Sequence, residues 1–439
     1  MHNVHRAALA PRWLISTAMV FGLALSTSPA QAQTAVVHAG TLLAVPGERP
    51  ATGQSIILDG ERILRIEPGF TDPASLGEDV ALLDFSDQFV LPGLMDMHVH
   101  LRGDLSTSRR EDVLTLTAET MTLQAQVNGM KTLRAGFTTV RDLGAPPPVI
   151  YALRDAIRNG LVQGPRIYAA GSALAATGGH GDVDGYKAEL LELWTPDTIC
   201  DGPVACRQAV RNAVKFGADW IKITATGGVL SDTGTGLNQQ MTDDELVQIM
   251  ETAHALGIKV AAHAHGVDGI NASLRAGVDS VDHGTFLNSE SVDLFLETGA
   301  YWVPTLMPGA LLPAQMEGNP FFTPEITEKV KLAVSASEEG FALAYRRGVK
   351  IAFGTDSGVT PHGNNAQEFA LMVSRGMSEM DAIRSATVVT AELLEVSELL
   401  GTLEAGKLAD IIAVDGNPLE DITELERVEA VVKGGVLVN

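Results

Sequence analysis

Short apolar runs separated by turn residues fill both ends of the chain. In residues 34–89, the runs "SIIL" and "RILRI" flank the pair Asp59-Gly60, which is typical of a tight β-hairpin turn. Near the carboxyl end, "GKLADIIAVDGNP" and "VEAVVKGGVLVN" show the same alternation. We therefore expect one small β-sandwich domain built from both ends, residues 33–89 together with residues 401–439.

Between these ends, apolar segments alternate with helical patterns. Eight apolar segments predict strands: "FVLPGLMDMHVH", "TTVRDLG", "RIYAAGS", "ADWIKITATGG", "IKVAAHAHG", "DSVDHGT", "YWVPTL" and "KIAFGTDSG". Helical patterns such as residues 242–257 and 323–348 begin with Thr and end with Gly, as capped helices do. The alternation predicts an α/β fold, a (β/α)8 TIM barrel over residues 90–400, with its active site at the carboxyl ends of the strands.

Polar residues cluster at those strand ends. They are His98 and His100, Lys222, His263 and His265, His283, and Asp356. Each has an ordinary alternative: a histidine can be a hydrogen-bonded core residue, an Asp can cap a helix, and a buried Lys can pair with an acid. Taken together, the ordinary explanations require five strands to place such a residue at the same end by chance. The pattern therefore favours a metal centre.

Four neutral imidazoles and a carboxylate suit divalent cations, most likely Zn²⁺, with Mn²⁺, Co²⁺ or Ni²⁺ as alternatives. One ion would use His98, His100 and Asp356, and a second ion would use His263 and His283. Two neighbouring cations repel each other, so an anion must bridge them. Lys222 would supply this anion if CO₂ converts its amine to an N6-carboxylated lysine.

Several longer motifs resemble a known group of enzymes. "LPGLMDMHVHL", "KITATGG", "GTDSG" and "GTLEAGKLADIIAVDGNPL" resemble the amidohydrolase superfamily over nearly the whole chain. "TGGHGD", "AAHAHG" and "VDHGT" are similar to its binuclear metal branch. That branch contains Xaa-Pro dipeptidases, imidazolonepropionase-like enzymes and ochratoxin-degrading amidohydrolases, and the resemblance is greatest to the last group.

The resemblance implies hydrolysis of an amide or peptide bond next to a carboxylate-bearing amino acid, by metal-activated hydroxide. The substrate would be ochratoxin A, an N-acyl amino acid or a dipeptide. Asp356 would accept the proton of water and pass it to the leaving nitrogen. His180 and His265 are candidates for polarising the carbonyl or holding a substrate carboxylate, although His265 is equally consistent with a structural role. Arg102 and Arg141 are possible partners for that carboxylate.

Other functions stay open at this point. A Xaa-Pro dipeptidase, a cyclic amidohydrolase or a deaminase of the same superfamily would share most of these motifs, as would a non-catalytic metal-binding protein. Deaminases of this fold typically use one metal and lack the bridging lysine, so Lys222 argues against them. The segment "PTLMPGALLPAQM" after the seventh strand is expected to be a loop. It would either contribute apolar surface to a substrate pocket or simply cover the barrel.

The amino terminus and the charge bear on location and partners. We expect residues 1–32 to be a signal peptide, because two arginines precede an apolar run and an Ala-Gln-Ala site follows that run. A membrane anchor is the alternative, but the run is short for a bilayer. We expect a secreted or periplasmic protein. With 54 acidic against 31 basic residues and a net charge of −23, nucleic acid and anionic membranes are not expected partners.

Two further expectations concern cysteines and assembly. Cys200 and Cys206 are the two cysteines of the chain, and their spacing permits either a local disulfide or two reduced thiols. The expected partner is a small-molecule amide, and the resemblance implies a homo-oligomer.

Overall fold

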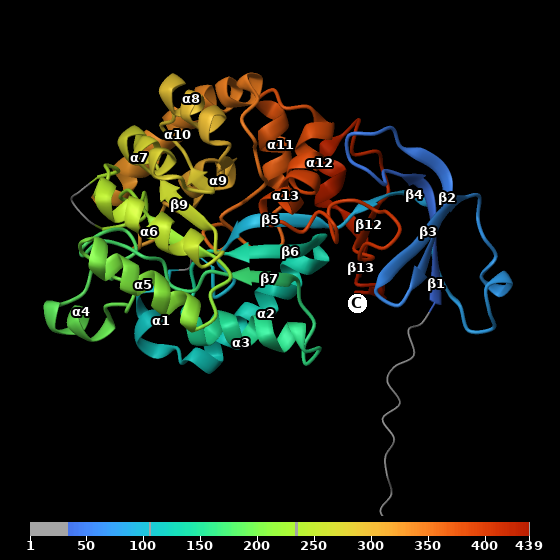
Figure 1. Ribbon diagram of the computed structural model, residues 1–439, viewed down its shortest axis with the longest axis horizontal. Helices are drawn as coiled ribbons and strands as arrows, with labels where there is room; N and C mark the ends of the chain where they lie inside the picture. The colour runs from blue at the N-terminus through green and yellow to red at the C-terminus, as the bar shows by residue number, and fades with distance from the viewer. Residues whose placement is uncertain (1–33, 105–106, 233–235, 439) are drawn as a thin grey trace, which may run out of the picture.

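Strands from both ends of the chain form one sheet in the computed structural model, which describes residues 34–104, 107–232 and 236–438 (Figure 1). The strands of this sheet are β1 (Thr34–Leu42), β2 (Ala51–Asp59), β3 (Arg62–Pro68), β4 (Ala81–Pro92), β12 (Ile411–Val414), β13 (Val428–Lys433) and β14 (Val436–Leu437), in the order β14-β13-β12-β4-β1-β2-β3. The two ends meet where β12 pairs antiparallel with β4. The second layer of a sandwich and the domain boundaries remain predictions, and residues 1–32 lie outside the described residues.

The β2–β3 hairpin forms where the Asp-Gly turn predicts it. Asp59 pairs with Arg62 across the turn, and Gly60 has a positive φ of 58°, which glycine adopts at little cost. Apolar side chains of β1, β2, β4 and β12 form the core of this part, and Val37, Ile56, Val90 and Ile411 are fully buried in it. The hairpin prediction is therefore confirmed.

The middle of the chain supplies parallel strands in two groups. β5 (Leu94–Val99), β6 (Phe137–Asp142) and β7 (Arg166–Ala169) form one group. β8 (Ile221–Thr224), β9 (Val260–Ala264), β10 (Ser280–His283) and β11 (Tyr301–Val303) form the other. An isolated parallel bridge from Leu174 to Ile223 joins the groups on one side, and on the other side residues 350–358 bridge to both, from Ile351 to Trp302 and from Ser357 to Val99. This order is consistent with the (β/α)8 barrel, which stays a prediction.

Helices surround these strands, as Figure 1 shows. They are α1 (Arg109–Thr115), α2 (Ala118–Arg134), α3 (Pro147–Arg158), α4 (Ala188–Trp194), α5 (Pro203–Lys215), α6 (Asp243–Ala255), α7 (Val267–Ala276), α8 (Ser289–Thr298), α9 (Leu306–Gln315), α10 (Pro324–Arg347), α11 (Gln367–Ser374), α12 (Glu379–Ser385) and α13 (Val388–Leu393), with short 3-10 turns η1 (Pro73–Ser75) and η2 (Ile422–Glu426). The caps predicted for α6 and α10 are present. Thr242 and Glu245 form a capping box, and Gly348 ends α10 with a φ of 84°.

The eighth predicted strand, residues 350–358, is not continuous. It pairs with its neighbours only through isolated bridges, between Ile351 and Trp302 and between Ser357 and Val99. The backbone turns away at Asp356, whose φ of 57° is incompatible with a strand. The segment nonetheless lies between β11 and β5, because the Met97 N–H donates to the Phe353 carbonyl.

The expectation of a loop after the seventh strand is wrong. Residues 306–315 form helix α9 even though Pro313 lies inside it. Its first N–H groups, those of Leu306 and Met307, donate to the two oxygens of Glu368 at 2.7 and 2.8 Å. This carboxylate from α11 satisfies backbone donors that the local sequence leaves unpaired.

Cys200 and Cys206 form a disulfide, which settles the alternative that their spacing left open. Both residues are buried, and Cys206 lies in the first turn of α5.

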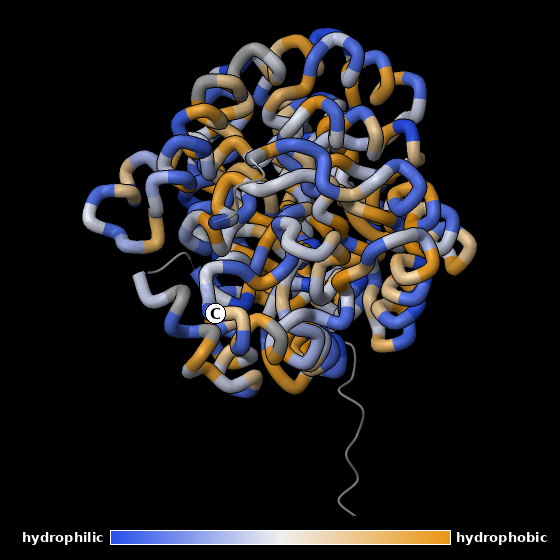
Figure 2. The backbone as a smooth tube through the Cα atoms, turned by 90° about the vertical axis from the view of Figure 1, so that its left-hand side faces the viewer, coloured by the Kyte–Doolittle hydropathy of each residue, from blue (hydrophilic) through white to orange (hydrophobic). Residues whose placement is uncertain are grey.

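Figure 2 shows hydrophobic segments gathered inside the molecule, with hydrophilic segments on many of the outer turns. None of the helices formed by the described residues has the length and apolar character to span a bilayer.

Candidate metal centre

The residues singled out at the strand ends come together around one cavity of about 1040 Å³. His98 lies in β5, Lys222 in β8, His263 in β9 and His283 at the end of β10, while Asp356 follows from the interrupted eighth segment. Three further predicted residues line the same cavity: His100, His180 and His265. The carboxyl ends of the parallel strands therefore converge as the sequence predicts.

The first group consists of His98, His100 and Asp356. Asp356 Oδ1 lies 3.2 Å from His100 Nε2 and 3.6 Å from His98 Nε2, and the two Nε2 atoms are 3.3 Å apart. All three ligand atoms lie within 4.8 Å of one another. Two imidazole nitrogens and one carboxylate oxygen facing a common point form a donor set suited to a divalent cation.

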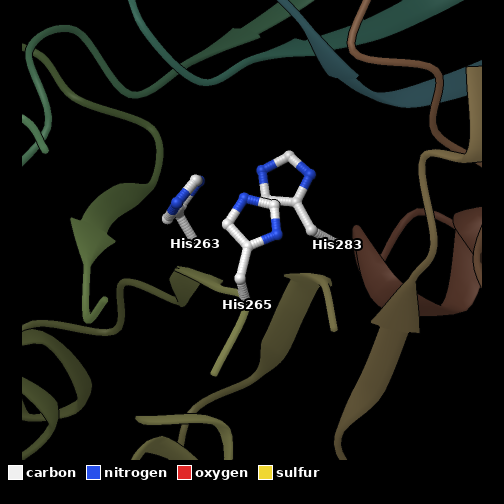
Figure 3. Close-up of side chains that lie close together, drawn as sticks. All are labelled: His263, His265 and His283. Carbon is white, nitrogen blue, oxygen red and sulfur yellow. The ribbon is translucent and has the colours of Figure 1, made fainter. Parts of the chain in front are cut away.

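The second group consists of His263, His265 and His283, whose ligand atoms also lie within 4.8 Å of one another (Figure 3). His265 and His283 stack with ring centroids 4.8 Å apart, and His263 meets both of them edge to face. His283 also lies 4.9 Å from the His98 ring, so the two groups adjoin. The sequence predicts His263 and His283 as ligands here, and the structure brings His265 within the same distance of both.

Threonine hydroxyls fix two of these imidazoles. His283 Nδ1 lies 2.7 Å from Thr305 Oγ1, and His265 Nδ1 lies 2.7 Å from Thr285 Oγ1. When Nδ1–H donates to the hydroxyl, the lone pair of Nε2 is left for a ligand. Sequence reasoning missed both threonines, because neither has a signal beyond its place after a strand.

Backbone strain also concentrates here. His283, Thr305 and Asp356 have positive φ angles of 71°, 46° and 57°. Each such residue costs on the order of 1 kcal/mol or more, and surrounding contacts must compensate for that cost. The strained conformations aim the side chains of His283 and Asp356 into the cavity, which identifies this end of the strands as a functional site.

Asp282 is the central residue that sequence reasoning missed. It is fully buried, and its Oδ2 accepts from Lys222 Nζ at 2.8 Å and lies 3.1 Å from His98 Nδ1. Its Oδ1 accepts from Arg141 Nη2 at 3.2 Å. Burial alone would raise the pKa of Asp282, but the charges of Lys222 and Arg141 outweigh it and hold the pKa below its ordinary value. A Lys and an Arg within apolar strand segments, Lys222 in β8 and Arg141 in β6, were the available signal, because buried cations require an acid.

Burial keeps the imidazoles neutral. It lowers the pKa of His98 to about 4 and the pKa values of His180 and His265 to about 3. The pKa values of His263 and His283 also fall well below the ordinary value, first through burial and then through neighbouring histidines. A neutral imidazole is the form that binds a metal. The cluster is therefore in its ligand form at neutral pH.

His180 lies in the segment between β7 and α4. Its ring lies against His263 with centroids 4.2 Å apart, and its Nδ1 hydrogen-bonds to Ser231 Oγ. Gly228 leaves room for it, because a Cβ there would lie 2.1 Å from His180 Nδ1. The structure thus places His180 against the second histidine group, at the wall of the cavity.

Arg102 and Arg141, the two arginines considered as partners for a substrate carboxylate, differ in whether they line the cavity. Arg141 is fully buried, donates to the Met97 carbonyl, Ser280 and Asp282, and stacks on Trp220. It does not contribute to the cavity lining, whereas Arg102 does. Arg141 is therefore a structural cation of the core.

The donor set fits divalent metals by a further test. His263 Nε2 and Asp356 Oδ1 are buried without a hydrogen-bond partner among the described residues. Leaving such atoms unpaired costs about 1 to 3 kcal/mol each. Cations bound by the two groups would satisfy both atoms.

Comparison with known proteins agrees with this geometry. The model of the Amidohydrolase family matches residues 89–438. An ochratoxinase from Aspergillus niger is 30% identical over 428 residues, which cover 93% of this chain and 87% of that protein.

Solved structures are similar over the same range. A Xaa-Pro dipeptidase with methionine bound in its active site has a TM-score of 0.87 and 41% identity, covering 93% of this chain and all of that one. A prolidase in complex with N-methylphosphonate-L-proline has a TM-score of 0.83 and 31% identity, with the same coverage.

Proposed function

The chain belongs to the amidohydrolase family and is a hydrolase of C–N bonds, and from this premise we propose that it uses two metal ions to hydrolyse an amide bond next to a carboxylate-bearing amino acid. The substrate would be ochratoxin A, an N-acyl amino acid or a dipeptide. The observation that carries the proposal is the presence of two adjoining ligand groups in one cavity.

The metals would be held by residues already in place. The first group, His98, His100 and Asp356, would hold one ion, and His263 and His283 would hold the other, and Zn²⁺ is the proposed metal at both sites. When bound, such ions act as Lewis acids toward a carbonyl and lower the pKa of water toward about 7. The family typically uses divalent metals, which supports this assignment.

Lys222 would bridge the ions as an N6-carboxylated side chain. Its neutral amine would form a bond to the carbon of CO₂ and release one proton, which gives a carbamate anion. Burial lowers the pKa of Lys222, against the opposing charge of Asp282, and so increases the share of reactive amine. The Nζ atom keeps one hydrogen in the carbamate, with Asp282 Oδ2 at 2.8 Å as its acceptor.

Proton transfer is assigned to Asp356. Its Oδ1 would lie on the metal, which leaves the second carboxylate oxygen to take a proton from water and deliver it to the leaving nitrogen. His180 and His265 would orient the substrate carbonyl by hydrogen bonds. Both line the cavity beside His263.

The substrate class rests on the cavity and the relatives. A volume of about 1040 Å³ admits an acyl group larger than a single amino acid side chain. The related structures contain methionine and N-methylphosphonate-L-proline, both of which carry a carboxylate. A Xaa-Pro dipeptidase is the second candidate, favoured by the 41% identity to such an enzyme. A cyclic amidohydrolase activity is a further alternative, whereas a deaminase activity is disfavoured by Lys222.

Other parts of the proposal concern the whole protein. We propose that residues 1–32 are a signal peptide and that the protein is secreted or periplasmic, for which the Cys200–Cys206 disulfide is supporting evidence. We also propose the barrel and the composite sandwich as its two domains and a homo-oligomer as its assembly.

A substrate panel tests the function. Ochratoxin A, N-acyl amino acids and Xaa-Pro dipeptides would be incubated with the Zn²⁺-loaded protein, and the released amine would be measured. We expect turnover of at least one class, and its loss in Asp356→Asn at unchanged fold. No turnover of any carboxylate-bearing amide would refute the proposal.

A further inference from the structure

The backbone that carries two candidate metal ligands continues into a basic side chain. His98, His100 and Arg102 all line the cavity, whereas the alternate residues Met97, Val99 and Leu101 are fully buried. β5 ends at Val99, and Leu101 and Arg102 form a turn shortly after it. Arg102 therefore lines the cavity two residues after His100 in the chain.

Three side chains form hydrogen bonds with the backbone around Arg102. The Leu101 N–H donates to Asp142 at 2.7 Å, and Asn128 Nδ2 donates to the Leu101 carbonyl at 3.1 Å. His362 Nε2 lies 3.2 Å from the His100 carbonyl and 3.4 Å from the Gly103 carbonyl. These contacts fix the backbone position from which the Arg102 side chain projects, so the backbone does not have to be ordered on binding.

The guanidinium group of Arg102 has no hydrogen-bond partner among the described residues. Within the part of the chain that the structure describes, Arg102 makes no hydrogen bond or ion pair, although Asp142 and Asp112 are near enough to act on its charge. A guanidinium has five N–H donors, and leaving them unpaired in a half-buried position is unfavourable. Lys131 lines the same cavity, but its ammonium donates to Asn128 at 3.1 Å and lies 3.9 Å from Asp104.

We infer that Arg102 binds the carboxylate of the substrate and thereby selects amides of anionic amino acids. A guanidinium pairs with a carboxylate through two parallel hydrogen bonds, which fixes orientation as well as charge. The amide bond beside that carboxylate would then face His98 and His100, which line the same cavity. This inference rests on the proposed function and names the residue responsible for its substrate class.

The test compares matched substrates on two variants. Wild type, Arg102→Met and Arg102→Lys would be assayed on the N-acyl amino acid or Xaa-Pro dipeptide that is hydrolysed fastest, and on its C-terminal carboxamide. We expect Arg102→Met to lose about 100-fold in kcat/KM on the carboxylate, mainly through KM, and less than about threefold on the carboxamide. Arg102→Lys should be intermediate, because it keeps the charge without the paired hydrogen bonds.

Lys131→Met is the matched control, and circular dichroism and metal content would verify each variant. Equal losses on the two substrates for Arg102→Met, or a carboxylate-selective loss for Lys131→Met instead, would overturn the inference. If no amide is hydrolysed, the proposed function fails, and binding of L-methionine and L-methioninamide by calorimetry decides the inference separately. A preference of tenfold or more for L-methionine that disappears in Arg102→Met supports it, and the same ratio in both proteins overturns it.

Discussion

The Lys222 ammonium donates to Asp282 Oδ2 at 2.8 Å, and the same oxygen lies 3.1 Å from His98 Nδ1, so Asp282 joins the candidate bridging lysine to a candidate metal ligand. The same carboxylate accepts from Arg141, so two buried cations depend on it. The relationship explains why a lysine can occupy the middle of a buried strand before any metal or CO₂ is bound.

Replacing Asp282 by Asn should be strongly destabilising. It removes the negative charge that compensates Lys222 and Arg141, and breaking a buried pair costs about 3 to 5 kcal/mol. Urea unfolding would measure the loss in free energy. The matched control is Asp279→Asn near the start of the same strand, where the acid pairs with the exposed His254 and a smaller loss of about 1 kcal/mol is expected. Similar losses for the two variants would show that Asp282 has no special role.

Metal content should follow the two ligand groups. His263→Ala removes a ligand of the second group only, so we expect about half of the wild-type metal content per chain by elemental analysis. His254→Ala, which alters an exposed histidine of α6, should leave the content unchanged. Equal metal content in wild type and His263→Ala would contradict the proposed second site.

Carboxylation of Lys222 can be observed directly. Protein loaded with Zn²⁺ in ¹³C-bicarbonate should give one carbamate carbon signal in the NMR spectrum, because CO₂ adds to a single buried amine. Lys222→Met should lack the signal, whereas Lys329→Met, which alters another partly buried lysine near the cavity, should keep it. A signal that survives Lys222→Met would place the carbamate elsewhere.

The sequence predicts what is periodic or local, and it misses what depends on contacts across the fold. The strand ends that carry His98, His263 and Asp356 are visible because apolar runs stop there, and Lys222 is visible as a charge inside such a run. Asp282 adjoins His283 in the sequence, yet its importance depends on two cations contributed by β6 and β8.

Helix α9 shows the same limit in the backbone. Its prolines favour a loop, but the helix forms because the Glu368 carboxylate, about sixty residues away, accepts its first two N–H groups. The interrupted eighth strand is likewise decided by contacts with β5 and β11 rather than by its own apolar pattern.

Removing the disulfide should destabilise the protein moderately. The Cys200–Cys206 bridge closes a short loop, and chain entropy predicts a loss of about 2 kcal/mol for Cys200→Ala/Cys206→Ala. Urea unfolding of the double variant and of wild type, with and without reductant, would measure it. Reductant should affect wild type alone. Two titratable thiols in the oxidised, unfolded wild type would contradict the disulfide.

Glu368 should make stability depend on pH. Burial raises the pKa of Glu368 to about 8, against the lowering effect of the Leu306 and Met307 N–H groups. An acid whose pKa is raised by folding stabilises the protein fully below its unfolded pKa and loses that contribution as the pH rises to the folded value. Between about pH 4.5 and 8, this group should therefore lower the free energy of unfolding by on the order of 1 kcal/mol per pH unit.

Glu368→Gln isolates this dependence, because glutamine does not ionise. At pH 5 the variant should be less stable than wild type, since its amide cannot accept both N–H groups of α9. At pH 9 the difference should shrink or reverse, because only wild type must then bury a charge. Urea unfolding of both proteins at pH 5, 7 and 9 would measure the change. A stability difference that stays constant over this range would mean that Glu368 does not titrate between the folded and unfolded states in this window.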